Sequence, residues 1–191
     1  MKRRNVSLLS LASMLACFLS STAVADPATE EIHVKGKEEF KLKHEGDEWK
    51  LHGPGDVKRV IRAEAGGWAL VGEDRKTLMR AKKSTDGAVH VTNGAGAATH
   101  DLKPGGDGFE LHGSDGALLW RVKVKADKFN VYDAAGKRAF HGKRKDDGIS
   151  IHDDGDAQLW KIKGIAELAP AAPFGLPVDM GEVALLYVAR R

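Results

Sequence analysis

Apolar and polar residues alternate along this chain in short runs that recur about every 20 residues. Each run has an apolar residue at its first position, a mostly polar residue next and a second apolar residue after it. Six residues open these runs, at steps of 19 to 21 positions: Trp49, Trp68, Val89, Phe109, Phe129 and Ile149. Alternation with period two is typical of a strand with one buried face. The pattern therefore predicts six equivalent strands that share a core.

Each run is followed by a turn rich in glycine and aspartate, such as His112–Gly116 and His152–Asp156. Glycine supplies positive φ and aspartate caps a turn locally, so these turns favour hairpins. A second alternating strand follows, most clearly at Leu118–Lys125 and Gln158–Lys163. The unit is therefore a hairpin of about 20 residues, and six hairpins give about twelve strands, with Phe40–His44 as a lead-in strand.

The closing segment departs from this alternation. Val183–Ala189 is apolar on every face, so a helix here must be buried. Asp179 is suited to cap it, and we expect a helix over residues 178–190; the alternative is one more strand. At about a dozen residues, the segment is too short to span a bilayer. Because about twelve strands leave a lumen that strand side chains alone do not fill, the predicted fold class is a mainly β barrel around this helix.

The N-terminus has the features of a secretory signal peptide over residues 1–25. Lys2–Arg4 is basic, Val6–Leu19 is apolar, and Ala23–Ala25 is a small-residue cleavage site. We expect residues 26–38 to be a linker and residues 39–191 to be a single barrel domain of an exported protein, periplasmic or extracellular. The alternative is a lipoprotein attached at Cys17, the only cysteine of the chain.

Charge argues against nucleic acid as a partner. The chain has 30 basic and 27 acidic residues, and removal of the three basic residues of the leader leaves 27 of each. A neutral mature chain has no global attraction for nucleic acid or for an anionic membrane, so only local basic patches remain as candidates. The sequence does not indicate the oligomeric state.

Two predicted strands carry such a patch. The basic residues that alternate with apolar ones are Arg121, Lys123 and Lys125 on one strand and Lys161 and Lys163 on the other. If the two strands are neighbours, this face could hold phosphate or anionic lipid headgroups. The alternative is a solvated outer face whose charge is balanced by acidic turns.

Three histidines, His52, His112 and His152, occupy the same position in different hairpins. Three imidazoles at one rim could bind zinc or copper, although the alternative is a strand-end residue that packs beside a turn. The acidic turns at Lys145–Gly148 and Asp153–Asp156 could hold calcium, but hairpin turns require such residues in any case. We therefore expect no metal and no other cofactor.

No motif in the sequence indicates catalysis. The mature chain has no cysteine nucleophile, no phosphate-binding loop ending in Gly-Lys-Ser/Thr and no H-E-x-x-H. Gly113–Gly116 contains a serine between glycines, but it is a hairpin turn without the strand–turn–helix context of a nucleophile elbow. We expect a non-enzymatic protein.

Two segments give the chain a resemblance to a known family. "FGLPVDMGEVALLYVA" (Phe174–Ala189) looks like the closing segment of scramblase and LURP-one chains, and "GDAQLWKIKG" (Gly155–Gly164) looks like their hairpins. With its six hairpins and final helix, the chain resembles the tubby-like superfamily, which includes the LURP-one-related proteins and the phospholipid scramblases. The resemblance implies a twelve-stranded barrel threaded by a hydrophobic C-terminal helix.

The resemblance also implies a class of ligand. Tubby domains bind phosphoinositide headgroups through basic side chains, and scramblases are linked to calcium-dependent lipid movement. The mature chain has neither the cysteines that scramblases palmitoylate nor a calcium loop of the form D-x-[DN]-x-[DN]-G. An exported protein would not meet cytosolic phosphoinositides, so the resemblance leaves the ligand open.

We therefore expect an exported, non-enzymatic binding module, most concretely a peripheral binder of anionic lipid headgroups in the cell envelope. The alternative is a structural or protein-interaction scaffold of the envelope. A further alternative is an enzyme or metal binder with a site at the barrel rim.

Overall fold

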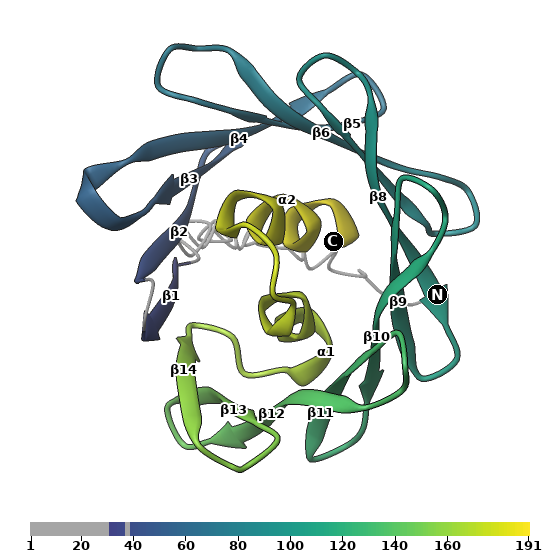
Figure 1. The fold of residues 1–191 in the computed structure, drawn as a ribbon. Coiled ribbons are helices and arrows are strands. Elements are labelled where there is room, and N and C mark those ends of the chain that lie inside the picture. The colour runs from purple at the N-terminus through teal and green to yellow at the C-terminus, as the bar shows by residue number, and fades with distance from the viewer. Residues whose placement is uncertain (1–30, 37–38) are drawn as a thin grey trace, which may run out of the picture.

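The computed structural model describes residues 31–36 and 39–191. Fourteen antiparallel strands form one closed barrel, in which consecutive strands pair and β1 also pairs with β14 (Figure 1). The strands are β1 (Glu31–Gly36), β2 (Phe40–Glu45), β3 (Glu48–His52), β4 (Lys58–Glu64), β5 (Gly67–Val71), β6 (Thr77–Lys83), β7 (Val89–Asn93), β8 (Ala98–Gly105), β9 (Gly108–Gly113), β10 (Leu118–Val124), β11 (Lys128–Asp133), β12 (Arg138–Lys145), β13 (Gly148–Asp153) and β14 (Gln158–Lys163). A short 3-10 turn, η1 (Pro54–Asp56), joins β3 to β4. The expected signal peptide and the alternative lipid attachment at Cys17 lie outside the described residues.

The prediction of a mainly β barrel is confirmed, with fourteen strands instead of about twelve. The extra hairpin consists of β2, the expected lead-in strand, and β1, which occupies residues 31–36 of the segment expected to be a linker. Ile32 and Val34 of β1 are buried and alternate with more exposed residues, so this short segment has the pattern of a strand. β1 closes the barrel because it pairs with β2 on one side and with β14 on the other.

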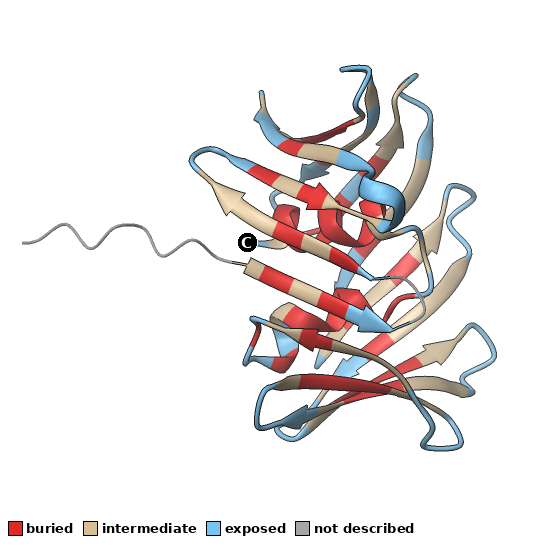
Figure 2. Ribbon diagram, turned by 90° about the vertical axis from the view of Figure 1, so that its left-hand side faces the viewer, coloured by how far each residue is buried: buried red, intermediate tan, exposed pale blue. Residues whose placement is uncertain are grey.

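The repeated apolar positions form the inner face of the barrel. Five of the six residues that open the repeats are buried, and Trp68 is partly buried against the same core. The residues two positions later are all buried: Leu51, Leu70, Val91, Leu111, Val131 and Ile151. Figure 2 shows buried segments along the strands and exposed residues at the hairpin turns. A shift of one residue would turn these side chains outward, so burial of this face fixes the register.

The lumen holds the helix predicted at the C-terminus. α2 (Met180–Arg190) lies inside the barrel, and all its residues from Gly181 to Ala189 are buried (Figure 1). The Asp179 carboxylate caps it by accepting a hydrogen bond of 2.8 Å from the Gly181 N–H. The predicted helix is therefore confirmed, starting two residues later than expected, and the alternative of one more strand is wrong.

A second helical segment, not predicted from the sequence, shares the lumen with α2. It consists of α1 (Leu168–Ala171) and a 3-10 turn, η2 (Ala172–Gly175). The Phe174 ring lies 5.2 Å from the Tyr187 ring of α2 and 5.9 Å from the Phe40 ring of β2, measured between centroids. Phe174 thus links both helical segments to the wall. Within the described ranges, no helix has both the length and the apolar character needed to cross a membrane.

The side chain of Phe129 on β11 is fully buried between the wall and the lumen segment. Gly142 on β12 faces one edge of this ring, and a Cβ at position 142 would lie 2.3 Å from a ring carbon. Gly175 in η2 faces another edge, where a Cβ would lie 2.6 Å from the ring. The absence of a side chain at both positions makes room for the aromatic ring between the wall and the lumen segment.

We predict that Gly142→Ala lowers the free energy of unfolding by about 1–3 kcal/mol, because the new methyl group overpacks the Phe129 ring. Gly53→Ala is the matched control, since a Cβ there would meet its nearest atom only at 3.9 Å and the backbone φ of −107° suits alanine. Urea unfolding of both variants measures the difference. Equal stability of the two variants would contradict this prediction, because it would mean that β12 shifts enough to accommodate the methyl group.

Candidate functional site

The five basic residues singled out from the sequence lie on two strands of the barrel wall that do not touch. Arg121 and Lys123 are on β10, Lys125 follows it directly, and Lys161 and Lys163 are on β14. Strands β11, β12 and β13 separate β10 from β14, which corresponds to roughly 19 Å at the usual spacing between strands. The five residues therefore belong to one broad surface, and they do not form one compact site.

Three of these five cations are paired with acids. Arg121 Nε donates to Glu110 Oε1 at 2.7 Å, and this bond lowers the pKa of Glu110. Lys161 and Lys163 both contact the Asp147 carboxylate, the latter at 3.1 Å. Hydrogen bonds from Lys161 and then Lys163 lower the pKa of Asp147 to about 2. Their positive charge is thus largely balanced locally, as the solvated-face alternative anticipated.

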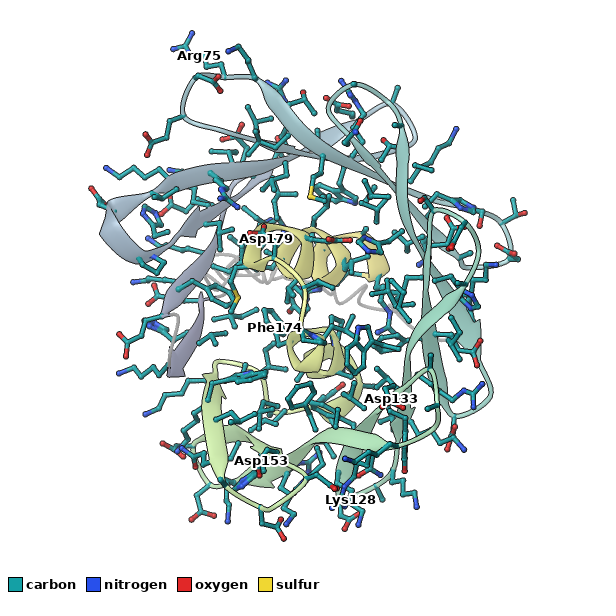
Figure 3. The ribbon with its side chains drawn as sticks, viewed as in Figure 1. Arg75, Lys128, Asp133, Asp153, Phe174 and Asp179 are labelled. Atoms are coloured by element: carbon teal, nitrogen blue, oxygen red, sulfur yellow. The ribbon has the colours of Figure 1, made fainter. Side chains whose placement is uncertain are left out.

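The other two cations behave differently. Lys123 and Lys125 are exposed, and no acidic side chain of the described residues pairs with either. Lys125 N–H donates to the Lys128 carbonyl at 2.7 Å, so Lys128 of β11 lies beside them. We call Lys123, Lys125 and Lys128 the lysine edge. Figure 3 shows Lys128 on one side of the barrel and Arg75 on the opposite side.

The histidines of the shared sequence position are not brought together. His52 lies on β3, His112 on β9 and His152 on β13, and no two of these strands are adjacent. His112 contacts Glu110 at 3.1 Å and the Gly116 carbonyl at 3.0 Å, which is the expected role of a strand-end residue beside a turn. These three residues therefore do not make a metal site.

A different cluster of possible metal ligands lies on the outer face of β12 and β13. His141 and His152 are opposite each other in the ladder, and their rings stack with centroids 5.2 Å apart. His141 Nε2 lies 3.0 Å from the Oδ1 of Asp156, in the β13–β14 turn. One ligand atom from each of the three residues lies within 4.8 Å of the others.

This region buries polar side chains on the outside of the barrel. Of the four buried polar residues in the described chain, Asn130, His141 and Ser150 lie on the outer face of β11–β13. Burial lowers the pKa of His141, helped by the nearby Lys143 and Arg138 and opposed by Asp156. The imidazole therefore favours its neutral form.

His141 escaped the sequence analysis because it is on the second strand of its hairpin, outside the shared position. The signal was nevertheless present. His141 and His152 are equidistant from the turn at Asp146–Asp147, so an antiparallel hairpin places them opposite each other.

The fourth buried polar residue lies inside the barrel. Glu182, in the first turn of α2, has 4% of its side chain exposed, and its Oε1 lies 2.5 Å from Nδ1 of His100 on β8. Burial raises the pKa of Glu182, and the attraction of His100 only partly opposes this.

An apolar pocket of about 300 Å³ lies where the chain enters α2. Phe140, Trp160 and Phe174 line it, together with aliphatic residues of the bend before α2. Trp160 Nε1–H donates to the Phe174 carbonyl at 3.1 Å, which fixes one aromatic wall. All the residues that line this pocket are apolar, so it offers no group for acid–base or nucleophilic chemistry.

The acidic turns considered for calcium are occupied by other contacts. Asp147 pairs with Lys161 and Lys163, and Asp154 accepts a bond of 3.0 Å from Arg138. Asp153 accepts from the Ala157 N–H at 2.9 Å. These contacts are those of hairpin turns, and they do not converge on one point.

Comparison with known proteins identifies no family for this chain. No family model matches the chain, and no curated protein matches it significantly. Among solved structures, the X-ray structure of a protein from Arabidopsis thaliana is similar, with 9% identity and a TM-score of 0.45, over 83% of this chain and 92% of that chain. A likeness at this level supports no statement about family or activity.

We predict that Glu182→Gln changes how stability depends on pH. Because the folded state raises the pKa of Glu182 above its usual 4.5, this carboxyl contributes stability below about pH 4.5 that is lost as the pH rises through the folded pKa. The wild type should therefore lose stability relative to Glu182→Gln above pH 4.5. Urea unfolding at a series of pH values measures this difference.

Glu110→Gln is the control, for which stability should depend on pH in the opposite direction. Arg121 lowers the pKa of Glu110 in the folded state, so the wild type should lose stability relative to this variant as the pH falls below 4.5. Curves for Glu182→Gln and the wild type that stay parallel from pH 4 to 8 would contradict a raised pKa.

Proposed function

We propose that this chain is a non-enzymatic binding module that contacts anionic lipid headgroups through the lysine edge. The observation that carries this proposal is the position of Lys123, Lys125 and Lys128. They lie together at one end of β10 and β11, and no acidic side chain of the described residues pairs with them. Because no neighbouring acid balances these lysines, their charge can attract an external anion.

Two further basic residues flank the lysine edge, and both are paired with acids. Lys143, opposite Lys128 in the β11–β12 ladder, contacts Asp156, and Arg121, two residues from Lys123 on the same face, contacts Glu110. A basic residue near an anionic bilayer contributes about 1 kcal/mol, and the contribution falls off within a Debye length. The three lysines of the lysine edge, held on one rigid wall, therefore suffice for peripheral, salt-sensitive binding.

The apolar residues of the surface are placed elsewhere. Val57 and Leu78 are the exposed large apolar residues of the described chain, and they belong to the β3–β4 connection and to β6. Binding through the lysine edge would therefore depend on charge, without an inserted apolar side chain.

The proposal extends to family and location. A closed barrel with an apolar helix in its lumen agrees with membership of the tubby-like superfamily, in which basic side chains bind headgroups, while the count of fourteen strands departs from twelve. With the leader expected from the sequence, the anionic lipids would be phospholipids of the cell envelope. The apolar lining of the pocket at the entry to α2 agrees with a role other than catalysis.

We predict that the double reversal Lys123→Glu/Lys125→Glu weakens binding to anionic vesicles by at least about tenfold, because it replaces two attractive charges with repulsive ones. Flotation at low and high salt measures this loss. Anionic vesicles that contain phosphatidylglycerol are compared with neutral vesicles of phosphatidylcholine alone. The protein used in this assay starts at Asp26, so that it keeps every described residue and lacks the apolar leader. Arg75→Glu/Lys76→Glu, in the β5–β6 turn on the far side of the barrel, is the matched control and should bind as the wild type.

Binding that survives the reversal at the lysine edge, or that ignores salt, would refute the proposed surface. No binding of the wild type to either kind of vesicle would leave the alternative of a structural or protein-interaction scaffold.

A second variant tests the balanced part of the wall. Asp147→Asn should strengthen binding to anionic vesicles on the order of fivefold, because it removes one negative charge and frees Lys161 and Lys163. Asp74→Asn carries the same charge change in the β5–β6 turn, where Asp74 pairs with Lys76 at 2.9 Å, and should have no effect. The same flotation assay compares them. An equal gain in both variants would mean that only net charge matters.

A further inference from the structure

We propose that His141, His152 and Asp156 form a binding site for a divalent transition-metal ion, Zn²⁺ or a chemically similar ion, on the outer face of the barrel. This site is separate from the lysine edge, and the proposal does not depend on lipid binding. It rests on the position of three ligand atoms and on the unsatisfied state of the ring nitrogens.

The backbone holds the three side chains in place. His141 and His152 face each other across the β12–β13 ladder, which fixes the distance between their Cα atoms. Asp156 lies in the turn that follows β13, and its carboxylate extends back over β12 to His141. No loop movement is needed to bring the three together.

His152 already has the arrangement of a metal ligand. Its Nδ1 lies 3.0 Å from the backbone carbonyl of Asp156, and because a carbonyl can only accept, Nδ1 must carry the proton. In the neutral ring this leaves a free lone pair on Nε2. That nitrogen is buried and has no hydrogen-bond partner among the described atoms. Metal-bound histidines commonly donate their other N–H to a carbonyl in this way.

The buried, unpartnered ring of His141 is the second observation that points to a bound ligand. Its side chain is 1% exposed, and neither ring nitrogen makes a hydrogen bond with the described residues. Nε2 is near Asp156 but lacks the angular geometry of a hydrogen bond. Asn130, opposite His141 on β11, also has a buried Oδ1 without a partner. Buried polar atoms without partners destabilise a fold, and a bound cation would satisfy one ring nitrogen of each histidine.

The donor set selects the class of ion. Two imidazoles and one carboxylate suit Zn²⁺, Cu²⁺ or Ni²⁺, whereas Ca²⁺ and Mg²⁺ prefer sites made of oxygen alone. Tetrahedral Zn²⁺ with bonds of about 2.0–2.1 Å places its ligand atoms about 3.3 Å apart. The distance of 3.0 Å between His141 Nε2 and Asp156 Oδ1 is close to this value. Three protein ligands leave a fourth position for water or another donor.

One charge competes with the metal. Lys143 Nζ lies 3.0 Å from the same Asp156 oxygen that faces His141. Its side chain is 43% exposed, so the ammonium group can move into water when a cation binds. Lys143 and the metal ion are therefore alternative partners of one carboxylate. Removing the charge of Lys143 should raise the affinity for the metal, an effect that a purely structural cluster would not show.

Asp156 offers a variant that removes a ligand without harming the turn. Its φ is +66°, and the equivalent turn position is Gly96, Gly116 or Gly136 in the three preceding hairpins. Asp156→Gly thus restores the residue that this backbone conformation favours.

The test is calorimetric titration of Zn²⁺ into the metal-free, tag-free chain starting at Asp26. We expect one equivalent to bind, and we expect Asp156→Gly and His152→Asn each to weaken binding by at least about tenfold. Lys143→Gln should tighten it several-fold. His90→Asn is the matched control, because His90 pairs with Asp101 on β7 and β8 without a second histidine.

Co²⁺ absorption provides a second readout, since visible bands of a tetrahedral ion should appear in the wild type and vanish in Asp156→Gly. Absence of Zn²⁺ binding in the wild type would overturn the proposal. So would unchanged affinity in both Asp156→Gly and His152→Asn, or a loss of affinity in Lys143→Gln. Vesicle binding by the lysine edge is measured without metal, so failure of one proposal leaves the other intact.

Discussion

The structure depends on filling the lumen of a fourteen-stranded barrel. Strand side chains alone cannot close a space of this width, so the inner face requires a separate apolar body. α2 supplies that body with an unbroken buried run from Gly181 to Ala189, and α1 with η2 occupies the space that remains beside β11 and β12. The two helical segments and the wall therefore stabilise one another. Charged groups enter this apolar interior at the buried Glu182–His100 pair and at Arg190, whose guanidinium lies 4.2 Å from the centroid of the buried Phe109 ring.

Because the interior is filled, binding sites for other molecules or ions must lie on the outer face of the barrel or at its rims. On most strands that face is polar and exposed, as expected for a half-buried sheet. Across β11–β13 it is different, because Asn130, His141 and Ser150 are buried beneath longer neighbours such as Lys143. The same wall carries the lysine edge at its rim. Both proposed sites thus lie on β10–β13 and the turns beside them, whereas near the start of the barrel Glu45 pairs with Lys43 and Lys50.

Much of the fold follows from periodicity. The inward positions, the hairpin turns and α2 could be predicted because each depends on a local pattern that the sequence repeats. β1 was missed because its pattern comprises only Ile32 and Val34, too short to distinguish a strand from a linker. α1 and η2 were missed because Leu168–Gly175 is rich in alanine and proline and has only four α-helical and four 3-10 residues, too few for a helical period to develop.

The surface sites were less accessible to sequence analysis. Alternation correctly placed Arg121, Lys123 and Lys161 on the outer face, but which of them are balanced depends on Glu110 and Asp147, whose reach is a tertiary property. The shared position of three histidines was a true regularity that did not bring them together, since equal positions in a closed barrel are spread around its circumference. The pairing of His141 with His152 follows from the hairpin, whereas the burial of His141 does not.

The position of the helices in the chain has a consequence for the order of assembly. Both helical segments follow all fourteen strands in sequence, yet they lie inside the ring that those strands close. The seam between β1 and β14 joins residues about 130 positions apart, such as His33 and Lys163. A completed ring would exclude the segment that must fill it, so the seam is expected to form around α1 and α2, late in folding. Until then the sheet has two open edges, and a chain held at that stage would be prone to pair with its own copies.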